Sequence, residues 1–209
     1  MRSSPCSSTT MANDQPLTKE AILDAAAQVL RRYGPEKTSV VDVAKVLQVS
    51  HGTLYRHFPS KAALREAVTE RWLLHISDDL QLIADQTQGS AQERLHLWFV
   101  TLISIKRTFR KEDPEMFSMY ANVTLESVEI IQHHVNHLIS QLAQIIEAGV
   151  KAAEFHTEAT DVTAKAVFLA TSRFHHPAHA REWSSATSEH DFENVWQLIL
   201  TGLSTSGRN

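Results

Sequence analysis

The sequence predicts an all-α protein in which a small N-terminal helical domain precedes a larger helical body. Apolar residues recur at intervals of three and four along most of the chain, as they do on one face of an α-helix, and strand-like alternation is scarce. Gly and Pro contribute only 6 residues each to a chain of 209, so long segments run without a helix breaker. A chain of this length buries a substantial core.

The composition excludes several classes of protein. A hydrophobic content of 43% and a charged content of 21% are typical of a globular chain in water. No apolar run approaches the roughly 18 residues of a membrane-spanning helix, and the N-terminus lacks the apolar segment of a secretory signal. A single cysteine, Cys6, cannot form an internal disulfide, which agrees with a reducing compartment. We expect a cytoplasmic protein that has no membrane partner.

The chain begins with a segment that shows no helical period. Residues 1–15 are rich in Ser and Thr, and we expect a disordered tail, whose start at Met1 or Met11 the pattern leaves open. Thr18 is placed to cap the first helix, which Gly34 ends. The apolar side of this helix is formed by Ile22, Ala25, Ala26, Val29 and Tyr33.

Residues 38–64 predict two short helices, a tight turn and the start of a third helix. Ser39 precedes an apolar face spaced i, i+3, i+4 and i+7, and Ser50 precedes a second helix expected over residues 51–58. Pro59 ends that helix, and Ser60 is placed to cap the third. The first apolar face consists of Val40, Val43, Ala44 and Leu47.

Two short helices joined by about four residues fit a helix-turn-helix, which lays its second helix in the major groove of DNA. The charges agree with this function. Residues 15–75 hold nine Lys and Arg against six Asp and Glu, a balance of +3, whereas the rest of the chain holds eleven against eighteen, a balance of −7. We expect a DNA-binding domain over residues 16–75. We expect an effector-binding and dimerisation domain over residues 76–209, and this second domain is acidic.

The spaced residues T-S-V-x-x-V-A-x-x-L-x-V-S-x-G-T-L-Y-x-H-F-x-S-K-x-x-L closely resemble the DNA-binding motif of the tetracycline-repressor (TetR) family, and the resemblance covers roughly Pro16 to Trp72. It implies an all-helical homodimer, most often a repressor that a small-molecule effector releases from a palindromic DNA operator. One departure is Gln48, where the family usually has glycine. A non-glycine residue there must adopt a left-handed conformation, which costs about 1 kcal/mol.

Carried over position by position, the resemblance implies which side chains contact double-stranded DNA. It implies phosphate contacts from Thr38, Tyr55, His57 and Lys61. It implies contacts with base edges from Val41, His51, Gly52 and Thr53.

The rest of the chain predicts the helices of the body. The helix that begins at Lys61 is expected to run to about Gln86, so the domain boundary near residue 75 falls inside it. Pro177 must end or kink a later helix, and residues 184–188 form a loop. Further helices are expected over residues 91–110, 115–122, 125–153, 161–174 and 191–203.

We expect a small-molecule effector to bind among the body helices that span residues 91–174, because an apolar pocket with a few polar anchors is the usual form of such a site. At 100° per residue, His133 and His137 point away from the apolar stripe of their helix, whereas His134 lies on its flank. The expected lining comprises Trp98, Phe99, Met116, Met119, Tyr120, His134 and Phe174.

The helices expected over residues 161–174 and 191–203 carry apolar stripes that require a cover. The family resemblance implies that these two helices pair with their symmetry mates as a four-helix bundle. Trp196 and Leu200 are expected near the centre of that homodimer interface. The full set of interface residues is Val162, Ala166, Ala170, Val195, Trp196, Ile199, Leu200 and Leu203.

Two other classes of function are weighed against a regulator. An enzyme is disfavoured because the chain has no HExxH, GxSxG, P-loop or CxxC motif. A helical interaction module without DNA is disfavoured by the phosphate-contact positions of the motif. Histidines near the effector region permit either a Zn or Ni site or a single His that anchors a ligand, and Pro177 favours the second. We expect no catalytic residue, metal or cofactor. The histidine set is His134, His175, His176 and His179, with Glu182 nearby.

Overall fold

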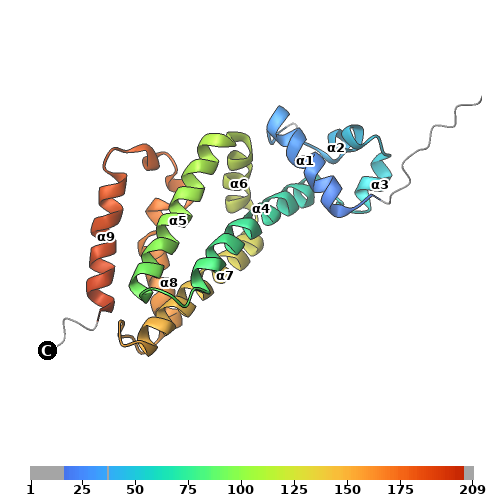
Figure 1. Ribbon diagram of the computed structural model, residues 1–209. Helices are drawn as coiled ribbons and strands as arrows, with labels where there is room; N and C mark the ends of the chain where they lie inside the picture. Colours follow the sequence, from blue (N-terminus) through green and yellow to red (C-terminus); the bar gives the residue numbers. More distant parts are fainter. Residues whose placement is uncertain (1–16, 37, 205–209) are drawn as a thin grey trace, which may run out of the picture.

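The computed structural model describes residues 17–36 and 38–204, and its regular elements there are all helical (Figure 1). The prediction of an all-α fold is confirmed. The tail expected over residues 1–15 lies outside the described residues. The α-helices are α1 (Lys19–Tyr33), α2 (Val40–Leu47), α3 (His51–Tyr55), α4 (Lys61–Ala84), α5 (Ala91–Glu112), α6 (Pro114–Glu126), α7 (Val128–Lys151), α8 (Thr160–Ala170) and α9 (Ser188–Leu203).

The helices form a head and a body, joined by α4. Figure 1 shows α1, α2 and α3 at one end of the molecule, while α4 runs out of this head and continues along α7 through the body. The other body helices lie on the far side of α4, with α9 outermost. Within the described part of the chain, no helix is both long and apolar enough to cross a membrane.

The head helices begin where the sequence places their caps. The Thr18 hydroxyl accepts a hydrogen bond from the Ala21 amide at 3.1 Å, and the Ser60 hydroxyl accepts one from Ala63 at 3.0 Å. Such caps satisfy amides that have no partner inside the helix, so they fix where each helix starts. The buried cluster of the head, hereafter the head core, includes Ile22, Ala26, Val29, Val40, Val43, Leu54, Phe58, Leu64 and Val68.

The head core also contains side chains from the body. Met116, Met119 and Val123 of α6 pack into it, and each is buried. The Arg31 guanidinium, at the end of α1, donates to the carboxylate of Asp113, the N-cap of α6, over 2.6 Å. The head is therefore attached to the body through α6 as well as through α4.

Several helix boundaries differ from the sequence prediction. The second helix of the helix-turn-helix ends at Tyr55 and not at Phe58. The helix expected over residues 161–174 stops at Ala170, because the Thr171 hydroxyl donates back to the Val167 carbonyl over 3.0 Å and the chain tightens into a short 3₁₀ turn. The last helix begins at Ser188, within the expected loop.

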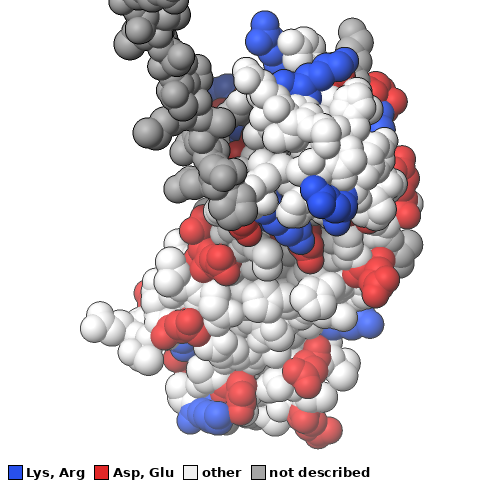
Figure 2. Space-filling model, turned by 90° about the vertical axis from the view of Figure 1, so that its right-hand side faces the viewer, with Lys and Arg blue, Asp and Glu red and all other residues white. Residues whose placement is uncertain are grey.

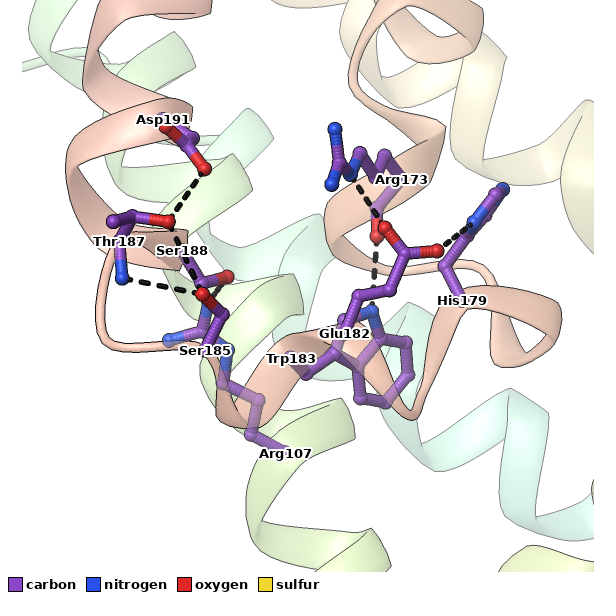
Figure 3. Close-up of polar contacts among 9 residues, drawn as sticks. All are labelled: Arg107, Arg173, His179, Glu182, Trp183, Ser185, Thr187, Ser188 and Asp191. Atoms are coloured by element: carbon purple, nitrogen blue, oxygen red, sulfur yellow. Dashed lines mark hydrogen bonds and ion pairs between the residues drawn. The ribbon is translucent and has the colours of Figure 1, made fainter.

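The segment between α8 and α9 is folded into three 3₁₀ turns, over Ser172–Phe174, Pro177–His179 and Glu182–Ser184 (Figure 3). The Trp183 indole donates to the Arg173 carbonyl over 3.0 Å, and the Arg107 guanidinium of α5 donates to the Ser188 hydroxyl over 2.8 Å. These bonds hold the connection against the body, so α9 starts from a fixed point.

Gly149 of α7 supplies a stability prediction. A Cβ built there would lie 2.7 Å from Cε2 of Phe155 and 2.8 Å from Cβ of Ala91, two buried side chains. We expect Gly149→Ala to lower the free energy of unfolding by about 1–3 kcal/mol, because a packed core tolerates extra volume poorly. Chemical denaturation measures the change.

The matched control is Gly52→Ala in α3. The nearest atom to a Cβ at that position is the Ser50 hydroxyl oxygen, at 3.9 Å, which is ordinary contact. This variant should be as stable as the parent or more stable by up to about 1 kcal/mol, since alanine favours the helix. Equal destabilisation by both variants would contradict the packing argument.

Candidate DNA-binding surface and effector site

The turn between α2 and α3 is built around a left-handed residue. Gln48 has φ 55° and ψ 38°, the conformation that its position after α2 predicts. The Val49 amide donates to the Ala44 carbonyl over 3.1 Å, which satisfies the end of α2 and reverses the chain. A non-glycine residue thus holds the helix-turn-helix geometry despite the strain of about 1 kcal/mol.

Helix α3 presents a polar surface to solvent. Leu54 is fully buried and anchors the helix to the head core, whereas His51, Gly52 and His57 are exposed and Tyr55 is 46% exposed. The Thr53 amide donates to the Ser50 hydroxyl over 3.2 Å, so the N-cap fixes the start of the helix. The exposed groups are hydrogen-bonding side chains on a short, rigidly mounted helix, which is the form of a major-groove reader.

The other three predicted DNA contacts lie at the edges of this surface. Val41 is half-buried on α2. The ammonium of half-buried Lys61 donates to the Glu36 carbonyl over 2.6 Å, which places this cation at the N-terminus of α4. Thr38 requires a correction: it is only 3% exposed and its hydroxyl donates to the Gly34 carbonyl, so its side chain is not presented to a phosphate.

The head end of the molecule carries basic side chains on one part of its surface. Figure 2 looks onto the head end and shows Lys and Arg mainly over its upper part, with Asp and Glu around the rim and over the lower part. The excess of Lys and Arg in the N-terminal part of the sequence agrees with the basic side chains on this upper part of the head. Positive charge on this face favours association with a phosphate backbone.

The structure does not bring the expected effector-site residues together in one pocket. Trp98, Phe99 and Phe174 fill the main core of the body, and Trp98 is fully buried with its indole bonded to Gln141. Met116 and Met119 are corrected to head-core residues, because that face of α6 turns toward α1 and α4.

Tyr120 and His134 remain candidates for the effector site. Tyr120 of α6 joins a third apolar cluster together with Phe117 and Trp183, and it accepts a hydrogen bond from a buried lysine, Lys106 of α5, over 2.9 Å. His134 of α7 is 9% exposed, as its angular position predicts, and its Nδ1 lies 3.1 Å from the Ser77 hydroxyl.

Lys106 is a central group that the sequence analysis did not identify. Its side chain is 2% exposed, and its ammonium lies 4.7 Å from the ring centre of Trp72 and 4.1 Å from that of Tyr120. Burial lowers the pKa of Lys106 to about 7. The sequence does indicate its burial, because Lys106 follows Phe99 and Leu102 by seven and four residues and so lies on the apolar face of the same helix.

Two buried histidines lie within the field of Lys106. Burial, together with the charge of Lys106, lowers the pKa of His134 to about 2 and that of His175 to about 3. The Nε2 atom of His175 lies 3.3 Å from the Thr171 hydroxyl, while His134 Nε2 has no hydrogen-bond partner among the described residues. The interior of the body thus holds neutral imidazoles and an amine that titrates near neutrality.

A surface hollow of about 150 Å³ lies between α4 and α7 and ends on His134. Leu73, Leu74 and Ile130 supply apolar walls. The polar part of the lining consists of Glu70, Ser77, His133, His134 and His137. A broader groove of about 520 Å³ between α5 and α9 is lined largely by charged and polar side chains, including Arg107 and Glu189. The α4–α7 hollow includes His134, the inward-facing histidine of the expected lining, and combines an apolar wall with several polar groups.

The expected dimer helices are only partly free to form an interface. Val162 is 69% exposed and Ala166 and Ala170 are also exposed, so one face of α8 is open. On α9, Val195, Ile199 and Leu200 are half-buried. Trp196 and Leu203 require correction, because they are 3% and 6% exposed and pack into the body core of the same protomer.

Two exposed leucines on these helices are absent from the interface residues that the sequence predicts. Leu169 of α8 is 58% exposed and Leu198 of α9 is 75% exposed. Leu169 lies seven residues after Val162, and Leu198 lies three residues after Val195, so both extend faces that the sequence identified. Periodicity alone located the helices but did not tell which of two apolar sides faces the core.

The remaining histidines of the alternative Zn or Ni site do not form a metal-binding group with His134. Figure 3 shows His179 directed at Glu182, with Nδ1 2.9 Å from Oε1, while Arg173 binds the other carboxylate oxygen over 2.7 Å. This arrangement lowers the pKa of Glu182, first through its bond to His179. In residues 17–36 and 38–204, no three His, Cys, Asp or Glu side chains are grouped as a metal site requires.

Comparison with known families gives two matches. Residues 22–68 match the family described as bacterial regulatory proteins, tetR family, and residues 91–196 match the tetracyclin repressor-like C-terminal domain. The two matches cover the helix-turn-helix and most of the body, and the second alone spans about half of the chain.

Individual relatives agree with these matches. An uncharacterized HTH-type transcriptional regulator of Bacillus subtilis, YvkB, is 29% identical over 196 residues, which cover 90% of this chain and 97% of the relative. A second one from that organism, YvdT, is 36% identical over 90 residues, so the match spans only 43% of the relative's length.

Solved structures share the fold. SmeT, the repressor of the Stenotrophomonas maltophilia multidrug efflux pump SmeDEF, superposes with a TM-score of 0.65 at 18% identity, covering 91% of this chain and 92% of SmeT. Bacillus subtilis FadR in complex with stearoyl-CoA superposes with a TM-score of 0.60 at 19% identity, covering 87% of this chain and 97% of FadR.

The buried histidines predict how stability depends on pH. The pKa of His134 is lowered from 6.5 by folding, so the unfolded chain takes up a proton below pH 6.5 that the folded chain refuses. Each such histidine therefore removes up to about 1.4 kcal/mol of stability per pH unit as the pH falls from 6.5 toward 5. Denaturation at several pH values should show a shallower slope for His134→Gln than for the exposed control His133→Gln. Equal dependence of stability on pH in the two variants would contradict the lowered pKa of His134.

Proposed function

The chain belongs to the tetracycline-repressor family of DNA-binding transcriptional regulators, and we propose that it is a repressor that a small organic effector releases from a palindromic DNA operator. The observation that carries the proposal is α3, a short helix held by the Ser50 cap with His51, Gly52, Tyr55 and His57 turned outward. The repressors and ligand complexes among the structural neighbours support the ligand-released form of regulation.

Contacts with DNA are assigned by chemistry. His51, Gly52 and Thr53 open α3, and the N-terminal part of a recognition helix is the part that meets base edges. Val41 adds an apolar contact from α2. Phosphate contacts come from the Tyr55 hydroxyl, the His57 imidazole and the Lys61 ammonium, with Lys61 at the N-terminus of a long helix, where anions are favoured.

Effector binding is coupled to the head through α6. Tyr120 faces Lys106 in the body, while Met116 and Met119 of the same helix pack in the head core. A ligand that shifts α6 therefore repacks the attachment of the head and changes the tilt of α4, and it need only favour one arrangement over the other. The proposed domain boundary near residue 75 separates DNA binding from effector binding, although the two parts remain in contact. Helix α4 runs through the boundary, and side chains of α6 pack in the head core.

Dimerisation uses the exposed faces of α8 and α9. Val162 and Leu169 are solvent-exposed on α8, and Leu198 is exposed on α9 beside the half-buried Val195, Ile199 and Leu200. Large apolar side chains grouped at the surface call for a cover. A two-fold dimer through these faces would set the two α3 helices roughly 34–36 Å apart, one turn of DNA.

The DNA-binding proposal predicts different effects for two classes of contact. Lys61→Ala and Tyr55→Phe should weaken binding to all sequences, and Lys61→Ala should reduce the salt dependence by about one unit. His51→Ala should instead relax the preference for the operator found upstream of the gene. Gel-shift titrations at several salt concentrations measure both effects. Lys151→Ala, an exposed cation at the end of α7, is the control and should bind as the parent does.

A changed sequence preference in Lys61→Ala with an unchanged salt slope would reject its assignment as a phosphate contact. A changed sequence preference in His51→Ala with an unchanged salt slope would support its assignment as a base contact, whereas a reduced salt slope would reject it.

The dimer proposal predicts that Leu169→Glu and Leu198→Glu give folded monomers in analytical ultracentrifugation, because each places a charge in the interface without a partner. Operator binding should fall with the dimer. Leu82→Glu on α4, where the parent side chain is 68% exposed, is the matched control and should stay dimeric. Stable dimers of both α8 and α9 variants would place the interface elsewhere.

A further inference from the structure

The folded body contains a cation that its packing does not require. Lys106 is 2% exposed, and the ion pairs of the described residues do not include it. An ammonium removed from water without a counter-charge opposes folding, and an apolar side chain at such a site is usually as stable or more stable. The lysine therefore calls for a role beyond the fold.

The surroundings of Lys106 accept a cation but supply no anion. Its ammonium donates to the Tyr120 hydroxyl over 2.9 Å and lies against the faces of Trp72 and Tyr120, which favour a positive charge. The titratable groups that interact with it from the neighbouring elements are Tyr120 of α6, His134 of α7, and His175 and His176 after α8. None of these is a carboxylate.

A second unsatisfied group lies nearby, at the end of a surface hollow. The Nε2 atom of His134 is buried and has no hydrogen-bond partner among the described residues, although Nδ1 faces Ser77. This histidine is one of the residues that line the hollow of about 150 Å³ between α4 and α7. Leu73, Leu74 and Ile130 form its apolar wall, and Glu70, His133 and His137 also line it. It is of a size for one or two fused aromatic rings or a short alkyl chain.

We propose that the effector is a small amphipathic organic anion, whose apolar part occupies the α4–α7 hollow and whose acidic group passes His134 to pair with Lys106. This inference names the ligand class of the effector site and so rests on the proposed function. The acid would accept from an N–H of Lys106 that Tyr120 does not use, and it would draw the ammonium away from Tyr120. Because Tyr120 is part of α6, this movement would reach Met119 in the head core.

The proposal predicts that binding is linked to a proton. Burial lowers the pKa of Lys106 to about 7, so much of the amine is neutral at pH 8. An anion binds the ammonium form, raises the pKa of the amine and makes the protein take up a proton. Affinity should therefore be highest below pH 7 and fall by about tenfold per pH unit above it.

The test is isothermal titration calorimetry of the full chain with benzoate and 2-naphthoate, beside benzamide and 2-naphthamide, which have the same shapes and no charge. Titrations at pH 8 in buffers of different ionisation enthalpy measure the proton uptake. We expect the acids to bind at least about tenfold more tightly than the amides.

Three variants separate charge from structure. Lys106→Met should lose the preference for the acid, and Lys106→Arg should keep it without proton uptake, because arginine stays charged. Lys111→Met, an exposed cation on the same helix, should match the parent in both respects.

Acids that bind the parent no better than amides, or bind Lys106→Met as well as the parent, overturn the proposal. Proton uptake that persists in Lys106→Arg also overturns it. The calorimetry contains no DNA, so its outcome is independent of the repressor function. A gel shift of the same variants tests that function separately, and loss of operator binding by the parent protein would reject it while leaving the anion site standing.

Discussion

The structure depends on one continuous helix that belongs to every buried cluster. Of the buried residues of α4, Leu64 and Val68 pack in the head core, Leu73 in the cluster around Tyr120, and Ile76 and Leu80 in the body core. A helix of 24 residues without an internal proline is a stiff rod. Its ends cannot move independently, so any repacking in the body changes the direction in which the head is carried. The exposed face of α3 is fixed to that head by Leu54 and follows it.

Helix α6 adds a second attachment between the head and the body, beside α4. Arg31 bonds Asp113 at the start of α6, and Met116, Met119 and Val123 enter the head core along its length. The same helix carries Tyr120 to the interior of the body. The two links act in parallel, so the head is oriented by the relative position of α4 and α6. Helices α4 and α7 bound the hollow that ends on His134, close to both links.

Much of this arrangement could be predicted from the sequence, and the reasons for the failures are physical. The caps at Thr18, Ser39, Ser50 and Ser60, and the left-handed Gln48, are set by local hydrogen bonds and were all predicted. The inward position of His134 followed from angles on a helix wheel. Trp196, Met116 and Met119 were assigned to the wrong surroundings, because a helix wheel gives the apolar face and not its partner. Lys106 was overlooked because a lysine is ordinarily read as a surface residue, although it lies in phase with Phe99 and Leu102.

A comparison of free energies explains why a buried charge can couple ligand binding to a change in the arrangement of α4 and α6. A ligand shifts an equilibrium between two arrangements only by the difference in its affinity for them, and a nearly complete shift needs about 5.5 kcal/mol. Apolar contacts differ little between two packed arrangements. A charge-assisted hydrogen bond to a buried ammonium contributes about 1.5–3 kcal/mol and depends steeply on distance. Lys106 has already lost its hydration in the folded protein, so pairing with an anion requires little further desolvation of the ammonium. An acid that reaches Lys106 in one arrangement of α4 and α6 and not in the other therefore favours that arrangement by at least about 1.5–3 kcal/mol, which is a large part of the nearly complete shift.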